Sequence, residues 1–207
     1  MTTPVSLPPH RAGATAPRGP RAPKAHGPGT PRAPGRRAVL SVIGNGTPID
    51  HDTEQLCLEL GRRAVDAGFR IACGGLGGIM AAVARGARQS ERWREGDVVG
   101  ILPGYDGAAA NPCVDVVVPT GLGWARNVLV AAMADVVVAV GGGSGTLSEM
   151  TYAWQLGKPI IGLSSVEGWS RRLGGERLDE RRGDQVWPAP SAEAAIAKAL
   201  ELLADES

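Results

Sequence analysis

Arg126 and Glu149 flank a glycine-rich segment, residues 141–146 (GGGSGT), and these residue types together could bind and act on a phosphate ester. The backbone N–H groups of glycine-rich turns and the planar guanidinium of arginine are common ligands of phosphate in proteins. A carboxylate beside a bound sugar phosphate can polarise a water molecule or an anomeric carbon. The combination predicts a phosphate site with a carboxylate next to it.

The segment 141–146 follows a strand expected at 135–140 and leads directly into a helix expected at 145–157. The first N–H groups of a helix have no partner within it, and the helix dipole is positive there, so an anion is favoured at this position. Ser144 and Thr146 add hydroxyl donors. The turn is not a Walker A loop, because no Lys-Ser or Lys-Thr pair follows it.

Two further glycine-rich turns, residues 44–46 (GNG) and 74–78 (GGLGG), also follow predicted strands. In open parallel sheets ligands bind beyond the carboxyl ends of the strands, so the three turns are expected to meet at one edge of the sheet. Glycine allows the backbone to approach a ligand closely. The residues predicted to bind phosphate or nucleotide are Gly44, Gly74, Gly75, Gly142, Gly143, Ser144, Gly145 and Thr146.

Each of these features has an alternative interpretation. The glycines of 141–146 could only shape a tight turn. With Ser148 they also come close to the Gly-x-Gly-x-x-Gly pattern of dinucleotide sites, which would indicate NAD. Glu149 could be an exposed glutamate stabilised by the helix dipole, and Arg126 a surface arginine. All of these alternatives stay open on the sequence alone.

The elements that must position these residues alternate along the chain. Short apolar runs rich in β-branched residues predict strands, and apolar residues at helical spacing between them predict helices. Buried strands alternating with helices indicate an α/β fold: one Rossmann-like, doubly wound parallel sheet with helices on both faces. The strands are expected at 38–44, 69–73, 98–102, 114–119, 135–140 and 159–163, and the helices at 52–68, 78–88, 123–134, 145–157 and 192–204.

The loops of this fold are expected to determine which ligand is bound. Asn45, Tyr105 and Trp124 lie in predicted loops and are candidates for contact with a base. The polar segment 164–190, which is rich in arginine, is expected to form an ordered loop or lid, with a plain surface loop as the alternative.

The formal net charge of +1 is the sum of two unlike parts. Residues 1–37 contain seven basic and no acidic side chains and nine of the 16 prolines, which predicts a disordered tail. Residues 38–207 contain 15 basic and 21 acidic side chains and are expected to form one nucleotide- or phosphate-binding domain. This charge balance indicates neither nucleic acid nor a membrane as partner. The predicted partner is a small nucleotide or other phosphate-bearing ligand, which the glycine turns and Arg126 would bind locally.

Several kinds of chemistry are not expected. The three cysteines are far apart and form no CxxC pair, and His51 is the only histidine of the predicted domain, so neither a metal site nor a Ser-His-Asp triad is predicted. No lysine is placed for a pyridoxal phosphate Schiff base, and no cofactor is expected. The start of the chain lacks the apolar region of a signal peptide, and with the unpaired cysteines this predicts a cytoplasmic protein.

The motifs resemble those of the LOG family, long described as lysine decarboxylase-like. Arg126 followed by residues 141–149 (GGGSGTLSE) resembles that family's arginine and PGGxGTxxE pattern, and residues 73–80 (CGGLGGIM) resemble its second glycine motif, GGGxxGLMG. The similarity covers about residues 38–165. Two positions differ, because Gly141 stands where the family has proline and Asn127 where it has lysine. The surrounding residues look closer to a sister branch, SLOG cluster 4, which includes relatives of molybdenum-cofactor carrier proteins.

The resemblance implies a Rossmann-like fold, a homodimer or higher homo-oligomer, and cytokinin riboside 5′-monophosphate phosphoribohydrolase-like activity. In such an enzyme Arg126 and Glu149 would be the catalytic pair, and the segment 142–146 would hold the 5′-phosphate. The reaction would cleave the N-glycosidic bond of a nucleoside 5′-monophosphate to a free base and ribose 5-phosphate. The sister branch implies the alternative, a non-catalytic protein that binds or carries a nucleotide or the molybdenum cofactor, a pterin phosphate.

Overall fold

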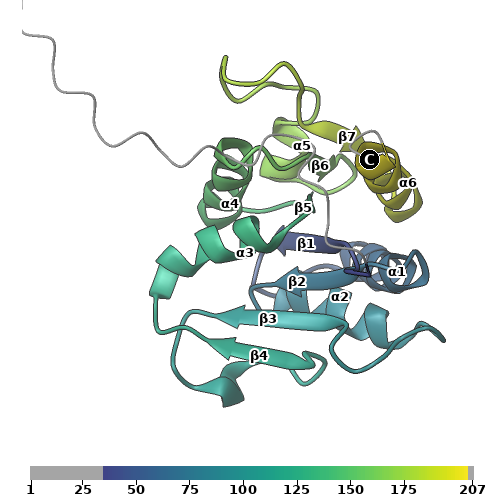
Figure 1. The fold of residues 1–207 in the computed structure, drawn as a ribbon, viewed down its shortest axis with the longest axis vertical. Coiled ribbons are helices and arrows are strands. Elements are labelled where there is room, and N and C mark those ends of the chain that lie inside the picture. Colours follow the sequence, from purple (N-terminus) through teal and green to yellow (C-terminus); the bar gives the residue numbers. More distant parts are fainter. Residues whose placement is uncertain (1–34, 205–207) are drawn as a thin grey trace, which may run out of the picture.

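The computed structural model describes residues 35–204, so the tail predicted for 1–37 lies outside the described residues except for its last three. The described chain forms a seven-stranded sheet in which every strand pair is parallel, in the order β4-β3-β2-β1-β5-β6-β7 (Figure 1). The predicted α/β, Rossmann-like class is confirmed. The strands are β1 (Val39–Gly44), β2 (Arg70–Cys73), β3 (Val98–Leu102), β4 (Val116–Pro119), β5 (Val136–Val140), β6 (Ile160–Leu163) and β7 (Trp187–Ala189).

Helices cover both faces of the sheet and divide the core in two. Three helices pack on one face: α1 (His51–Asp66), α2 (Gly78–Arg88) and α6 (Ala192–Ala204). Another three pack on the opposite face: α3 (Asn127–Met133), α4 (Ser144–Gln155) and α5 (Trp169–Arg172). Two short 3₁₀ helices, η1 (Gly107–Ala109) and η2 (Gly123–Arg126), complete the described structure. No helix within residues 35–204 has the length and apolar character needed to cross a membrane.

The order of the strands places one crevice at the centre of the sheet. The chain builds outward from β1 through β2 and β3 to β4, then returns through α3 to place β5 on the other side of β1. The turns after β1 and β5 therefore leave the sheet in opposite directions, and doubly wound proteins bind ligands in the gap between such turns. The sequence of β5, VVVAV, is buried at every residue because helices cover both of its faces.

Two glycines allow α1 and α2 to pack at very short range. A Cβ atom on Gly61 of α1 would lie 2.0 Å from the carbonyl oxygen of Val83, and one on Gly86 of α2 would lie 2.0 Å from that of Leu58. No side chain fits at either position without moving a helix. This pair of glycines therefore sets the separation of the helices behind β1 and β2.

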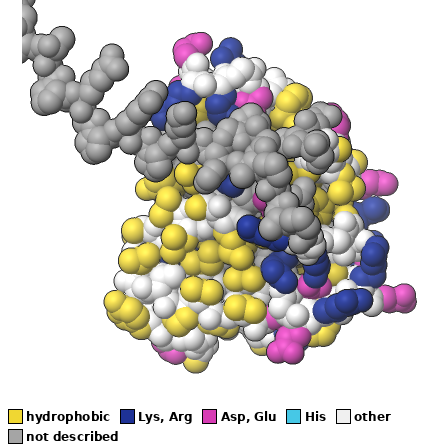
Figure 2. Space-filling view, in the orientation of Figure 1, with side chains coloured by type: hydrophobic (Ala, Val, Ile, Leu, Met, Phe, Trp, Pro, Cys, Tyr) yellow, Lys and Arg dark blue, Asp and Glu magenta, His cyan; other side chains and the backbone are white. Residues whose placement is uncertain are grey.

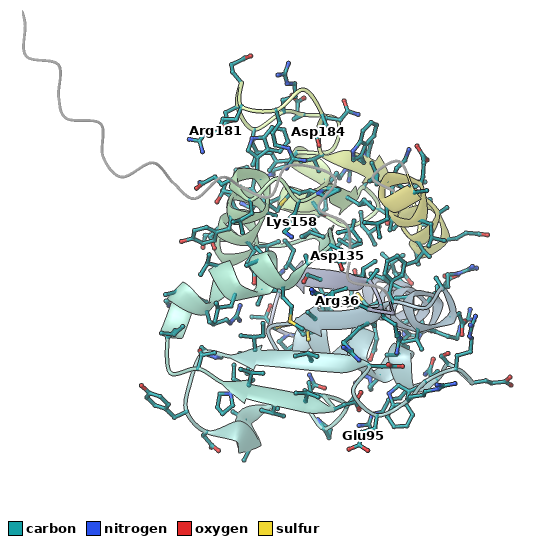
Figure 3. All side chains as sticks on the ribbon, in the orientation of Figure 1. Arg36, Glu95, Asp135, Lys158, Arg181 and Asp184 are labelled. Carbon is teal, nitrogen blue, oxygen red and sulfur yellow. The ribbon has the colours of Figure 1, made fainter. Side chains whose placement is uncertain are left out.

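Side-chain hydrogen bonds anchor the amino ends of β1 and β5. The carboxylate of Asp135 accepts a hydrogen bond of 2.8 Å from the backbone N–H of Val39, and Figure 3 shows Asp135 beside β1. At the predicted boundary of the tail, Arg37 pairs with the buried carboxylate of Asp97 and donates to the carbonyl oxygens of Gly68 and Phe69. Arg37 is thus held against the folded domain.

Three local details differ from the prediction. Helix α1 begins one residue before Asp52, because the carboxylate of Asp50 accepts the N–H of Thr53 at 2.8 Å and acts as the N-cap. The helix predicted at 123–134 begins as the 3₁₀ helix η2, and Gly123 there has a positive φ of 55°. The segment 164–190 contains α5 and the edge strand β7, whose central proline is tolerated only at an edge or a bulge.

The opposite edge of the sheet exposes apolar side chains. Val116 and Val118 of β4 are 44% and 39% exposed, and Leu122 and Trp124 of the following turn are 50% and 83% exposed. Figure 2 shows hydrophobic side chains gathered on this part of the surface. The predicted homo-oligomer stays a prediction.

We expect Gly61→Ala to lower the free energy of unfolding by about 1–3 kcal/mol, because the added methyl group forces α1 and α2 apart. This loss would appear although alanine is the better helix former. Gly183→Ala is the control, since a Cβ there meets nothing within 4 Å. Urea unfolding followed by circular dichroism measures both variants, and equal midpoints would contradict the expectation.

Candidate functional site

A cavity of about 330 Å³ lies where the turns after β1 and β5 separate. Four segments form its wall: the turn after β1, the start of α2, the junction of η2 and α3, and the first turns of α4. Its position matches the crevice expected at the reversal of the strand order. The lining residues are Gly44, Asn45, Gly46, Thr47, Leu76, Met80, Trp124, Arg126, Asn127, Gly143, Ser144, Gly145, Thr146 and Glu149.

Arg126 and Glu149 form a buried ion pair in the wall of this cavity. The guanidinium Nη1 of Arg126 donates to Oε1 of Glu149 at 3.0 Å, and the side chains are only 8% and 7% exposed. The Nε of Arg126 is buried and has no hydrogen-bond partner among the described residues. The interpretations of Arg126 as a surface arginine and of Glu149 as an exposed glutamate are therefore wrong.

Asn127 holds this arginine in place. Its side-chain oxygen accepts a hydrogen bond of 2.5 Å from the same Nη1 that donates to Glu149. Its amide nitrogen donates to Oγ of Ser148 at 2.8 Å, so one asparagine links α3 to α4. Gly74, the residue directly after β2, leaves the space for the guanidinium, since a Cβ there would lie 2.5 Å from Nη2 of Arg126.

The first turn of α4 presents free backbone donors to the cavity. Gly143 occupies the N-cap position and provides no side-chain cap, so the N–H groups of Ser144, Gly145 and Thr146 have no partner within the helix. Gly142 has a φ of 96°, and a Cβ on it would lie 2.4 Å from the side chain of Thr146. Glycine is therefore required at 142 to bring the chain into this helix start.

Burial raises the pKa of the Glu149 carboxyl from 4.5 to about 7. The charge of Arg126 and its hydrogen bond act in the opposite direction and do not cancel the effect of burial. A carboxyl group with a pKa near neutrality can accept or donate a proton at the edge of the cavity. Within residues 35–204, no group of three His, Cys, Asp or Glu side chains is arranged to hold a metal ion.

The structure brings together seven of the ten residues predicted for the site. Arg126 and Glu149 line the cavity together with Gly44, Gly143, Ser144, Gly145 and Thr146. Three predicted glycines lie behind the wall: Gly74 makes room for Arg126, Gly142 packs on Thr146, and Gly75 approaches Gly100 of β3.

Among the expected specificity residues, Asn45 and Trp124 line the cavity. Tyr105 lies outside it, with its ring against Gly121. Sequence reasoning did not assign a role to Asn127, Thr47 or Met80. Only Asn127 gave a signal, because it replaces the lysine of the related motif beside Arg126.

The chain is similar in sequence and fold to several known proteins. Residues 37–196 match the profile of the SLOG cluster4 family. An uncharacterized protein of Archaeoglobus fulgidus is 36% identical over 124 residues, which are 60% of this chain and 78% of the relative.

Three solved structures share the fold over nearly their whole length. The structural genomics target TM1055 is 35% identical, with a TM-score of 0.72 over 79% of this chain and 99% of that chain. A molybdenum cofactor binding protein from Rippkaea orientalis is 30% identical, with a TM-score of 0.71 over 81% and 98%. The molybdenum cofactor carrier protein of Chlamydomonas reinhardtii is 27% identical, with a TM-score of 0.68 over 81% and 99%.

We expect the stability of the protein to reflect the raised pKa of Glu149. Because this pKa is about 7 in the folded state and 4.5 otherwise, the unfolded chain loses the proton first as the pH rises. The contribution of Glu149 to stability therefore falls between about pH 4.5 and pH 7 and is constant above that window.

Glu149→Gln removes this titration. The free energy of unfolding of Glu149→Gln minus that of the wild type should therefore increase as the pH rises from about 4.5 to 7. The total increase is roughly 1.4 kcal/mol per unit of difference between the folded and unfolded pKa values of Glu149. Glu95→Gln, a surface change at the amino end of β3, should follow the wild-type profile (Figure 3). Parallel pH profiles of wild type and Glu149→Gln, measured by denaturant unfolding, would contradict the expectation.

Proposed function

We propose that this chain, which belongs to the SLOG cluster4 family, binds and carries a phosphate-bearing small molecule of the pterin phosphate class to which the molybdenum cofactor belongs. The observation that carries the proposal is the start of α4, where three residues whose backbone N–H groups have no partner within the helix line a cavity of about 330 Å³ together with Arg126. A phosphate group matches these donors in charge and in hydrogen-bonding capacity.

The hydrogen bonding of the pair Arg126–Glu149 favours binding over turnover. Oε1 of Glu149 accepts from Nη1 of Arg126, and Asn127 holds that same nitrogen, so the arginine and the carboxylate hold each other in the wall. Two proteins named for binding or carrying the molybdenum cofactor share the fold at 30% and 27% identity. These two lines of support favour a carrier of the same ligand class.

The proposal predicts that the backbone N–H of residue 144 contributes to phosphate binding. Ser144→Pro removes this N–H together with the hydroxyl, and proline suits the first helical position after the extended Gly143. Ser144→Ala removes only the hydroxyl and is the matched control. The proline variant should bind the phosphate ligand about tenfold more weakly than the alanine variant, because one hydrogen bond to a charged group is lost.

The probes are the molybdenum cofactor released from a molybdenum enzyme, and inorganic phosphate as its competitor. Mass spectrometry of the small molecules released when the purified protein is denatured identifies the bound ligand. Release of a pterin phosphate, with the expected order of the two variants in a binding titration, supports the carrier. Equal affinities of Ser144→Pro and Ser144→Ala would overturn the assignment of phosphate to α4.

A second candidate is the phosphoribohydrolase reaction on a nucleoside 5′-monophosphate. The observation in its favour is Glu149, a carboxyl group with a pKa of about 7 that lines the cavity. With the phosphate on α4, this carboxylate would stabilise the positive charge that develops on the anomeric carbon and direct a water molecule to it. Arg126 would orient the ribose phosphate.

A single assay distinguishes the carrier from the hydrolase. Incubation of the protein with AMP or GMP should release free base if the chain is a hydrolase, and Glu149→Gln should abolish the release while Glu95→Gln retains it. Chromatography of the reaction mixture measures the base. No release by the wild type, together with retained nucleotide binding, would exclude this candidate and leave the carrier.

A further inference from the structure

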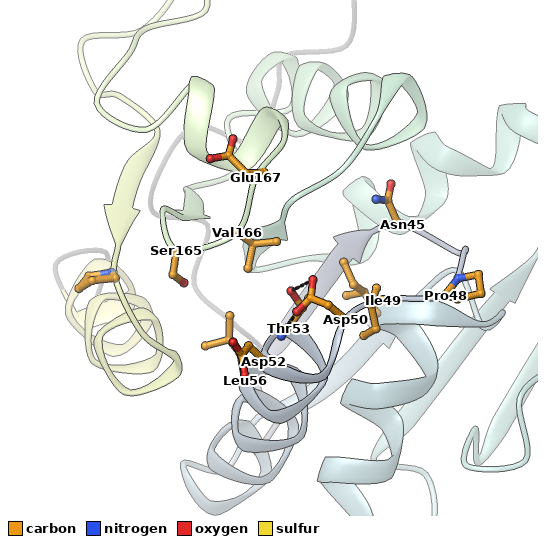
Figure 4. Close-up of a pocket in the computed structure, with 12 residues that line it drawn as sticks. Asn45, Pro48, Ile49, Asp50, Asp52, Thr53, Leu56, Ser165, Val166 and Glu167 are labelled. Carbon is orange, nitrogen blue, oxygen red and sulfur yellow. Dashed lines mark hydrogen bonds between the residues drawn. The ribbon is translucent and has the colours of Figure 1, made fainter.

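A second and larger cavity, of about 570 Å³, adjoins the phosphate cavity. It lies between the turn after β1, the start of α1 and the segment after β6 (Figure 4). Neither the residues at the start of α4 nor the pair Arg126–Glu149 is part of its wall. The lining residues are Asn45, Pro48, Ile49, Asp50, Asp52, Thr53, Leu56, Ile79, Ser165, Val166, Glu167 and Pro190.

The two cavities share one lining residue, and the segment that lines the second cavity is hydrogen-bonded to the turn that leads into the first. Asn45 lines both, and its side-chain oxygen lies 4.0 Å from the position of a Cβ on Gly143, the N-cap residue of α4. The segment after β6 also contacts the turn between β5 and α4. The N–H groups of Ser170 and Trp169 donate to the carbonyl oxygens of Gly141 and Gly142, at 2.9 and 3.2 Å. The two cavities therefore meet at Asn45, next to the residue that precedes α4.

The second cavity is lined by different kinds of side chain from those of the first. Ile49, Leu56 and Val166 offer apolar surface on which a flat ring can lie. The polar groups at its rim are mainly acceptors, and no lysine or arginine is among the lining residues. A phosphate group would be repelled here, whereas a neutral group rich in N–H donors would be bound.

Asp52 is the acceptor best placed to receive such donors. Both carboxylate oxygens of Asp50 already accept hydrogen bonds from Thr53, at 2.8 and 2.9 Å, and these bonds lower the pKa of Asp50. Glu167 pairs with Arg171, and in Figure 4 its carboxylate points away from Asp50. The carboxylate of Asp52 accepts no hydrogen bond from the described residues, so both of its oxygens are available to a ligand.

We propose that the second cavity binds the heterocycle of the ligand through the 2-amino-4-oxopyrimidine edge that pterins and guanine share, while the phosphate lies at α4. The adjacent ring N–H and amino group of this edge present two parallel donors, which match the two oxygens of Asp52. The apolar side chains pack against the ring. This assignment rests on the proposed function, because it takes the phosphate site as the anchor.

The test compares two nucleotides that differ only in the 2-amino group. GMP has this group and IMP lacks it, so the ratio of their dissociation constants isolates the proposed contact. The wild type should bind GMP about tenfold more tightly than IMP, and Asp52→Asn should bring the ratio close to one. Glu54→Gln, which alters a half-buried carboxylate of the same turn that pairs with Arg85 and does not line the cavity, should keep the wild-type ratio.

Isothermal titration calorimetry at one pH, with inorganic phosphate and 6-hydroxymethylpterin phosphate as further probes, gives these ratios and shows which heterocycle binds more tightly. Equal binding of GMP and IMP to the wild type, or an unchanged ratio in Asp52→Asn, would overturn the assignment of the heterocycle. If neither inorganic phosphate nor any phosphate ester binds, the proposed function itself is wrong and this assignment fails with it.

Discussion

The buried ion pair between Arg126 and Glu149 is the interaction on which the rest of the site depends. A charge buried without a partner is strongly destabilising, so the surrounding structure must keep both groups together and hydrogen-bonded. Asn127 does this by binding the guanidinium and α4 at once, and Gly74 does it by leaving room for Nη2. The buried Nε of Arg126 has no hydrogen-bond partner among the described residues, so the contacts with Glu149 and Asn127 do not use every donor of the guanidinium.

An acidic domain that binds a phosphate must do so through local donors. Residues 38–207 contain 21 acidic and only 15 basic side chains, so the charge of the whole domain does not attract anions. The start of α4 meets this requirement with backbone N–H groups, which bring no net charge, and Arg126 is already balanced by Glu149. Selectivity would then come from the second cavity, where Asp52 and Asp50 disfavour a second phosphate.

The fold was predictable because its central strands are continuous apolar runs that only a sheet covered on both faces buries, and β5 is the clearest case. The short strand β7 was missed because Pro188 argues against a strand, although an edge tolerates it. In the site, the glycine turn was recognisable from residue types and spacing, and Arg126 and Glu149 were candidates by position, but their pairing was expected only from the resemblance to the LOG family. The roles of Gly74 and Gly142 were not recognisable, since they depend on which side chain from another segment fills the space beside each glycine.

Gly141 shows how the departure from the related motif changes this site. Its φ of 57° is outside the range of proline, and its N–H donates to Oγ of Ser170 at 2.8 Å, a bond that proline cannot make. The proline of the LOG motif is thus incompatible with the path of the turn seen here. Because Ser170 also donates to the carbonyl oxygen of Leu163, the turn after β5 is joined to the end of β6. That link joins the segment that lines the second cavity to the turn before α4, so glycine in place of proline at position 141 allows the hydrogen bond that connects the surroundings of the two cavities.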